Sequence, residues 1–176
     1  MKNNFFILIF FLFVGCTSNT IVTKKATTET PCPIVLFSAE HSKYLVGNTQ
    51  PITLENIRYK AEINNYAFKN DCTINNKVFQ AEISLLFIVK PNLAEKSNIT
   101  LPFYMAILNE NDELIDMQYY QVDGNFKGEF ENDNYIETEL SKTIKLQIPL
   151  LNDEEYNLNK VIVGFMLDKE KLKILN

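Results

Sequence analysis

Short apolar runs alternate with clusters of polar turn residues along most of the chain beyond residue 33. In the segment 56–67, NIRYKAEINNYA, every second residue from Ile57 to Ile63 is apolar, which is the period of a strand with one buried face. Comparable strands are predicted at 34–39, 78–89, 101–108, 113–122, 143–150 and 161–167. Their number and spacing predict an all-β fold, an immunoglobulin-like antiparallel β-sandwich of about seven strands.

Turn signals predict how neighbouring strands connect. The segments 101–108 and 113–122 flank the polar sequence Asn109-Glu110-Asn111-Asp112, which predicts a β-hairpin. Asp123-Gly124-Asn125 predicts a further turn. The chain then ends in the segment 168–175, which lacks helix breakers and has Asp168 as an N-cap, so a short C-terminal helix is expected.

Two strands are apolar on both faces, at 85–89 and at 103–108. Each strand of a two-sheet sandwich presents one face to the core, so part of this apolar surface must point outward. One expectation is that the C-terminal helix covers it through Leu172 and Leu175. The functional alternative is an interface to another protein, because contiguous exposed apolar patches mark interaction sites. The candidate residues for that surface are Leu86, Ile88, Phe103 and Met105.

The chain begins with a different pattern, MKNNFFILIFFLFVGC, in which an apolar run at 5–14 ends abruptly before Cys16. The run has about half of the ~20 residues that a transmembrane helix needs. Lys2 before it and Gly15 after it match the charged and small-residue parts of a secretory signal. Residues 1–15 are therefore predicted to be a signal peptide.

The residues Phe13-Val14-Gly15-Cys16 resemble the lipobox of bacterial lipoproteins, although Phe13 stands where leucine is commoner. The resemblance implies that the Cys16 thiol receives diacylglycerol and that its new amino group is acylated after cleavage; no other cofactor is expected. Several acyl chains attach a protein stably to a membrane, whereas one binds reversibly. Thr17, where aspartate would signal retention in the inner membrane, implies the outer membrane. An ordinary signal peptide that ends by chance in a cysteine is the alternative.

After the cysteine the chain is rich in threonine and nearly free of large side chains, TSNTIVTKKATTETP at 17–31. Such a segment buries too little apolar area to offset its ordering entropy, so a flexible tether is expected. The predicted organisation is a signal peptide at 1–15, the lipidated cysteine and tether at 16–31, and one domain at 32–176.

The formal net charge of −5 excludes the basic surface that nucleic-acid binding requires, and it provides no attraction to an anionic membrane. The lipid anchor is thus the expected contact with the membrane. With Cys16 lipidated, Cys32 and Cys72 remain, and an even pair in an oxidising periplasm predicts a disulfide. Two buried free thiols are the alternative.

Candidate catalytic and metal-binding residues are few. The single histidine, His41, lies in a predicted loop, where a solvated side chain is expected. A nucleophile with a histidine base needs a third, orienting group, which no pattern indicates. A zinc site needs several histidines or cysteines, and the acidic turn at 109–113 lacks the glycine and the distal glutamate of an EF-hand. We therefore expect no enzyme activity and no metal site.

Several segments together resemble a family of small alphaproteobacterial lipoproteins that has no assigned activity. They are Cys32-Pro33, NIRYKAEI, Asp71-Cys72-Thr73, LPFYMAIL and the C-terminal YNLNKVIVGFMLDKEKLKILN. The resemblance implies an envelope location and supports pairing of Cys32 with Cys72. Because the family has no known chemistry, it assigns a role to no residue.

The expected protein is an outer-membrane lipoprotein on the periplasmic side. Its expected function is that of a non-catalytic accessory or scaffold module, which binds another envelope protein through a sheet face or an edge strand. The alternative is a binding protein for a small envelope ligand, such as a lipid or a peptidoglycan fragment. A large apolar cavity favours the ligand, and a filled core with an apolar outer patch favours the protein partner. An enzyme is expected only if His41 lies buried beside an acid and a hydroxyl or thiol.

Overall fold

A computed structural model of the chain describes residues 27–92, 98–126, 130–131, 134–150, 158–168, 171 and 175. The elements defined within these residues are all strands. In chain order they are β1 (Thr28–Thr30), β2 (Ile34–Phe37), β3 (Lys43–Gly47), β4 (Ile57–Phe68), β5 (Cys72–Asn75), β6 (Val78–Pro91), β7 (Asn98–Asn109), β8 (Leu114–Asn125), β9 (Phe130–Glu131), β10 (Asn134–Tyr135), β11 (Thr138–Pro149) and β12 (Leu158–Phe165). Every strand that the apolar pattern predicts is therefore present.

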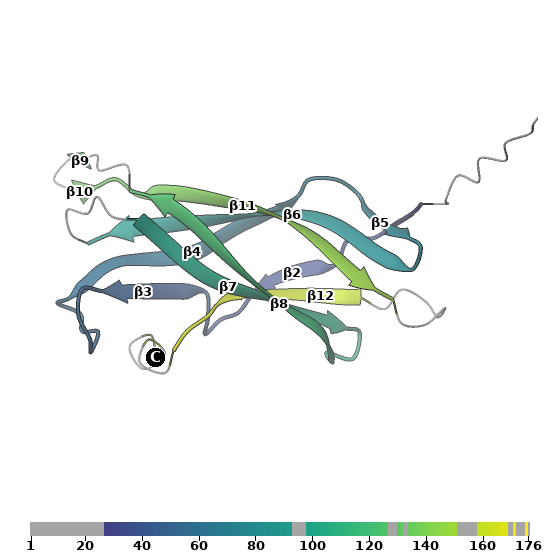
Figure 1. The fold of residues 1–176 in the computed structure, drawn as a ribbon, viewed down its shortest axis with the longest axis horizontal. Coiled ribbons are helices and arrows are strands. Elements are labelled where there is room, and N and C mark those ends of the chain that lie inside the picture. Colours follow the sequence, from purple (N-terminus) through teal and green to yellow (C-terminus); the bar gives the residue numbers. More distant parts are fainter. Residues whose placement is uncertain are drawn as a thin grey trace, which may run out of the picture.

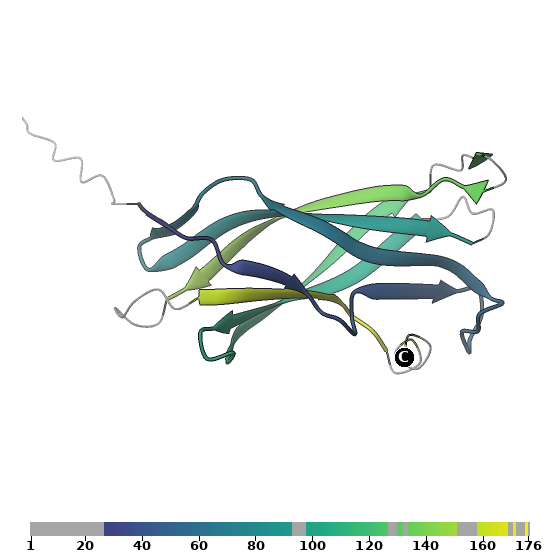
Figure 2. The same cartoon turned by 180° about the vertical axis from the view of Figure 1, so that it is seen from behind.

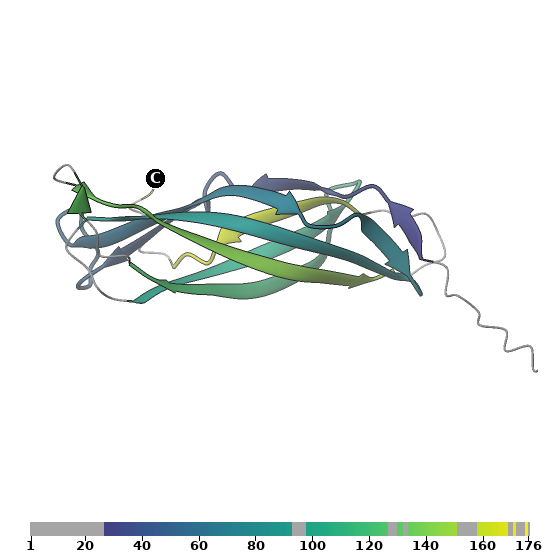
Figure 3. The same ribbon diagram turned by 90° about the horizontal axis from the view of Figure 1, so that it is seen from above.

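Two sheets pack face to face as a sandwich, and Figures 1 and 3 show their strands running along the long axis of the molecule. In the first sheet β11, β6, β4 and β3 lie side by side, β5 pairs with β6 beyond the end of β4, and β1 pairs with β5. The second sheet has the order β2-β12-β7-β8. An all-β two-sheet sandwich is confirmed. The prediction of a purely antiparallel one is wrong, because β2 and β12 are parallel.

The apolar pattern underestimates the number of strands, because more than seven are present. β1, β3 and β5 have three to five residues each, which is too short to show a period of two. β9 and β10 pair only with each other among the described strands. Short strands such as these are fixed by pairing with a longer neighbour rather than by their own sequence.

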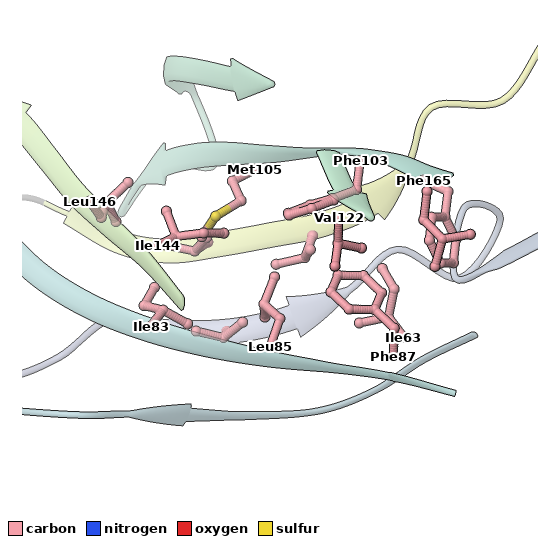
Figure 4. Packing of buried hydrophobic residues seen from close by; sticks show 14 of the residues in the cluster. Ile63, Ile83, Leu85, Phe87, Phe103, Met105, Val122, Ile144, Leu146 and Phe165 are labelled. Atoms are coloured by element: carbon pink, nitrogen blue, oxygen red, sulfur yellow. The ribbon is translucent and has the colours of Figure 1, made fainter. Parts of the chain in front are cut away.

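Alternation along the long strands directs one set of side chains into the space between the sheets. In β6, Ile83, Leu85 and Phe87 are fully buried, whereas most of the residues between them remain partly exposed. Figure 4 shows these three side chains facing residues of the second sheet. The ring of Phe87 lies 5.1 Å from that of Phe103 and 5.9 Å from that of Phe165, centroid to centroid. The space between the sheets is thus filled by packed side chains.

The predicted hairpin between β7 and β8 is confirmed, and Asn109 N–H donates to the carbonyl of Glu113 at 3.0 Å across its turn. The turn predicted at Asp123-Gly124-Asn125 is wrong, because these residues form the end of β8. A Cβ on Gly124 would lie 2.3 Å from Leu140 Cδ2 of β11. Glycine therefore lets β8 and β11 approach each other here, rather than making a turn.

The predicted boundary between tether and domain lies at residue 32. Strand β1, Thr28–Thr30, comes before that boundary and pairs with β5. The predicted disulfide is confirmed: Cys32 and Cys72 are bonded, with their Cα atoms 5.2 Å apart. The predicted helix at 168–175 falls mostly outside the described residues, as do Leu172 and the whole segment 1–15 with Cys16. Figure 2 shows β1 and β2 entering the sandwich at the end where β12 begins and where the β7–β8 hairpin turns.

Candidate protein-binding surface

The outer face of the second sheet is apolar across all four of its strands. Because directly paired residues of neighbouring strands lie on the same face, the register defines three rows that cross the sheet. The central row is Leu36, Ile162, Ala106 and Met117; the row on one side is Ile34, Lys160, Leu108 and Leu114; the row on the other side is Gly164, Tyr104 and Tyr119. We name the residues of these three rows the apolar face.

Several side chains of the apolar face are open to solvent. Ile34 and Leu114 are each 56% exposed, Leu36 is 44% exposed, Met117 37% and Tyr119 62%. They lie on the flanking strands β2 and β8, so large side chains border the sheet on both sides. Exposed apolar side chains gathered on one face of a sheet mark a candidate interaction site.

Two residues on the middle strands of the apolar face are small, Ala106 on β7 and Gly164 on β12. Ala106 is 7% exposed and is the direct neighbour of both Ile162 and Met117. Gly164 is buried beside Tyr104.

Tyr104 is held in place by contacts with Gly164 of β12 and with His41. A Cβ on Gly164 would lie 2.7 Å from Tyr104 Oη and 2.8 Å from its Cζ, so the phenol ring occupies the space that a larger residue would fill. Tyr104 Oη makes a 3.0 Å hydrogen bond with His41 Nδ1. His41 in turn accepts a hydrogen bond at its carbonyl from Phe165 N–H at 2.7 Å. The ring is thereby fixed in place before any partner binds.

The outer face of the first sheet is polar by comparison. The pairing of β4, β6 and β11 places Glu62 and Glu139 on either side of Ile88, and Thr143 beside Ser84. Farther along the same face Glu82 pairs with Lys145, and Gln80 with Thr73 and Gln147. The two sheets thus share one core and present opposite kinds of outer surface.

Charge is nearly absent from the apolar face. Lys160 is its single charged residue, and the Lys160 ammonium group forms an ion pair with the carboxylate of Asp112 in the β7–β8 turn. The turn itself is braced by Asn109, whose Oδ1 accepts hydrogen bonds from the N–H groups of Asn111 and Glu113, both at 2.9 Å. The acidic turn therefore neutralises the one cation of the face and is an internally bonded hairpin tip.

The residues predicted to form an interaction surface lie in three different environments. Phe103 and Met105 are fully buried between the sheets, so their assignment to an outer surface is wrong. Ile88 points outward from the first sheet and is only 8% exposed, since the polar residues beside it cover it. Leu86 is half-buried and lines a shallow depression with Asn65, Ala67, Lys69, Ser84 and Ser141. The outward-facing residues of this part of β7 are instead Tyr104 and Ala106, the neighbours of Phe103 and Met105.

The outer edge of β8 is partly covered by its own side chains. The carboxylate of Asp116 accepts hydrogen bonds from Met117 N–H and from Gln118 Nε2, both at 2.8 Å. Hydrogen bonds from Gln121 and from the hydroxyl of Thr100 hold the pKa of the Asp123 carboxyl below its usual range. An added strand would have to displace the Asp116 contacts from this edge, whereas the Asp123 contacts lie on the outer face, where Asp123 pairs with Thr100 of β7.

The histidine expected to be solvated is partly buried and bonded to Tyr104, so that expectation is wrong. The His41 ring bonds the hydroxyl of Tyr104, which is a residue of the apolar face. Within the described ranges no group of three or more His, Cys, Asp or Glu side chains could hold a metal ion. In the same part of the chain, no helix has the length and apolarity to cross a membrane.

Comparison with known proteins assigns no family: no family model, curated protein or solved structure matches this chain.

Proposed function

We propose that the chain is an outer-membrane lipoprotein, anchored through acyl chains on Cys16, and that its domain is a non-catalytic module that binds a protein of the cell envelope. The observation that carries the proposal is the contrast between the two outer surfaces of one sandwich. The first sheet exposes Glu, Lys, Gln and Ser, as a solvated sheet does, while the second exposes Ile34, Leu36, Met117 and Tyr119. Burying such side chains on association is favourable by ~25 cal/mol for each Å² of apolar surface removed from water.

The composition of the apolar face fits a protein partner. Tyrosine and methionine are enriched at the centres of protein interfaces and charged residues are depleted there. Tyr104 is already immobilised by His41 and Gly164, so binding would cost little side-chain entropy at this position. The filled space between the sheets favours a surface partner over a small ligand held inside the sandwich.

The anchor would place this face close to the membrane. The chain from Cys16 to Thr27 extends over at most about 40 Å if it is fully stretched. It reaches the domain at the end that carries Ile34 and the β7–β8 turn. The resemblance to small envelope lipoproteins supports the same location. A partner would therefore be a protein that lies at or near the same membrane.

The role is proposed to be non-catalytic because the polar groups of the face have structural partners. Tyr104 and His41 bond each other, and Lys160 pairs with Asp112. Each interaction joins segments that are distant in the sequence, which is a positioning function. A reactive site would instead need a nucleophile, a base and an orienting group directed at one open space.

The proposal is tested by chemical crosslinking of the full-length protein in cells, followed by purification and mass spectrometry. Leu36→Asp should abolish a stoichiometric crosslinked product, because a carboxylate would be buried in the interface, while the matched Thr143→Asp on the polar face should leave it unchanged. Cys16→Ser should release the protein from the membrane fraction and reduce the product. A product that survives Leu36→Asp at wild-type yield would overturn the assignment of the face. Retention of Cys16→Ser protein in the membrane after signal cleavage would overturn the lipid anchor.

A further inference from the structure

We propose that the partner of the apolar face is a second copy of this chain, packed face to face about a two-fold axis that runs parallel to the strands between β7 and β12. This inference rests on the proposed function, because it names the occupant of the same face. Two β-sheets that pack in this way lie about 10 Å apart with their strands nearly aligned, as the two sheets within a sandwich do.

Charge is the first argument. The whole chain has a net charge of −5, so two copies repel each other through most of their surfaces. Lys160 is the single charged residue of the apolar face, and Asp112 of the same chain neutralises it. Within the three rows, two copies that meet through this face therefore bring no uncompensated like charges together, and the acidic β7–β8 turns lie outside the rows. A strongly basic partner, by contrast, would find no acidic residue in the three rows of the face.

The sizes of the side chains give the second argument. A two-fold axis along the strands places β2 of one copy opposite β8 of the other, and β12 opposite β7. In the central row, Leu36 then faces Met117 of the second copy, and Ile162 faces Ala106. Ile162 thus meets the small Ala106, which is the alternation that lets two sheets interdigitate, while Leu36 and Met117 pack against each other at the borders of the row.

The size of the face is the third argument. Four strands at a spacing of about 4.8 Å, and about seven residues along β8 at ~3.4 Å each, give a footprint of roughly 450 Å² per copy. Together the two copies would bury roughly 900 Å² as a flat projection, and more as accessible surface. That area lies near the lower limit for a specific interface. The dimer is therefore expected to be weak in dilute solution and favoured where anchors concentrate the protein on one membrane.

Other occupants fit the described residues less well. An anionic bilayer would meet Glu110, Asp112 and Glu113 at the anchored end of the face. Lys171 lies away from the face: its Nζ is 4.6 Å from the ring centroid of Tyr44, whose own ring packs 5.4 Å from that of Phe165. That contact lies at the far end of β12 from Lys160.

The test uses two differently tagged full-length chains co-expressed in the same cells, one with Leu36→Cys and the other with Met117→Cys. A short bifunctional maleimide should join the two tags, with a yield about ten-fold above that of the matched pair Leu36→Cys with Thr143→Cys. Two Leu36→Cys chains should also crosslink poorly, because the axis leaves their β2 strands about 17 Å apart, three strand spacings across the sheets and ~10 Å between the sheets. Membrane fractionation and protein level show whether each variant folds and is anchored.

The outcomes separate this inference from the proposed function. Joining of the Leu36→Cys and Met117→Cys chains above both controls supports the two-fold dimer. Adducts of Leu36→Cys only with a different protein would overturn the dimer and leave the proposed function standing. No adduct from either position, in chains that are folded and anchored, would overturn the dimer; the crosslinking test with Leu36→Asp then decides the proposed function separately, because it does not need a cysteine in the partner. Equal joining in all three pairs would show that the anchors alone bring copies together, and would also overturn the inference.

Discussion

Replacement of Gly164 by alanine tests whether Tyr104 is fixed by close packing. The new Cβ would lie 2.7 Å from Tyr104 Oη, 2.8 Å from Tyr104 Cζ and 2.9 Å from His41 Cβ. Real Cβ atoms do not approach other heavy atoms so closely, so the phenol ring must move away. Its displacement breaks the 3.0 Å hydrogen bond with His41 Nδ1. The substitution therefore combines overpacking with the loss of one hydrogen bond.

The expected cost follows from those two contributions. Overpacking a well-packed site costs about 1–3 kcal/mol, and losing one hydrogen bond costs about 1 kcal/mol net. We expect Gly164→Ala to lower the free energy of unfolding by about 2–4 kcal/mol, measured by urea denaturation. Tyr104→Phe removes the hydroxyl alone and should cost about 1 kcal/mol.

A double-mutant cycle distinguishes this explanation from a general intolerance of alanine in β12. In a Tyr104→Ala background most of the close contacts are gone, so Gly164→Ala should cost at least ~1 kcal/mol less than in the wild type. An equal cost in both backgrounds would show that the Tyr104 ring is not the cause of the destabilisation. A Gly164→Ala protein as stable as the wild type would show that the site is not closely packed.

Three further predictions concern the buried residues Phe87 and Tyr59 and the disulfide between Cys32 and Cys72. Phe87→Ala should lower the free energy of unfolding by about 3–5 kcal/mol, whereas Leu86→Ala, one residue away on the outer face, should cost less than ~1 kcal/mol; similar values would contradict the assigned faces. The double variant Cys32→Ala, Cys72→Ala opens a loop of 40 residues and should lose about 4 kcal/mol in urea denaturation, and an unchanged midpoint would show that the bond is not a constraint. Burial raises the pKa of Tyr59, despite the opposing hydrogen bond from the Thr100 backbone, so its contribution to stability is complete below the ordinary tyrosine pKa of ~10 and is lost as pH rises through the folded-state pKa. Tyr59→Phe should therefore flatten the fall in stability above pH ~10, and parallel curves would rule this out.

The long strands were predictable because each repeats its apolar period over many residues. β4 shows this clearly between Ile57 and Ile63, where alternate residues are buried. The period then breaks at a bulge between Ile63 and Asn65, after which Tyr66 and Phe68 pack against the core. A bulge depends on how the partner strand pairs, so the pattern of a single strand does not locate it.

The apolar face was only partly predictable for a related reason. The strand at 101–108 is apolar at both parities, so its own sequence does not tell which set of residues faces the core. The structure buries Phe103 and Met105 and turns Tyr104 and Ala106 outward. The register with β8 and β12 decides this choice, because it aligns Ala106 with Met117 and Ile162 on one surface. Such a row joins residues of distant segments and leaves no local signal.

The roles of Gly124 and Gly164 were also not predictable from the sequences of their own strands. Gly124 suggests a turn in the sequence, yet in the structure it admits Leu140 of β11. Gly164 interrupts an otherwise apolar strand, and its reason is the ring of Tyr104. Both requirements come from close approach of residues on other strands, which a local pattern does not contain.

Site-specific photocrosslinking tests the central claim, that the apolar face is a protein-docking surface, most directly. A photoreactive amino acid would replace Met117 in the full-length protein in cells, and the same amino acid at Thr143 on the polar face would be the matched control. We expect a discrete protein adduct from position 117 and none from position 143. Adducts of equal yield from both positions, or none from position 117 in a folded and anchored protein, would contradict it.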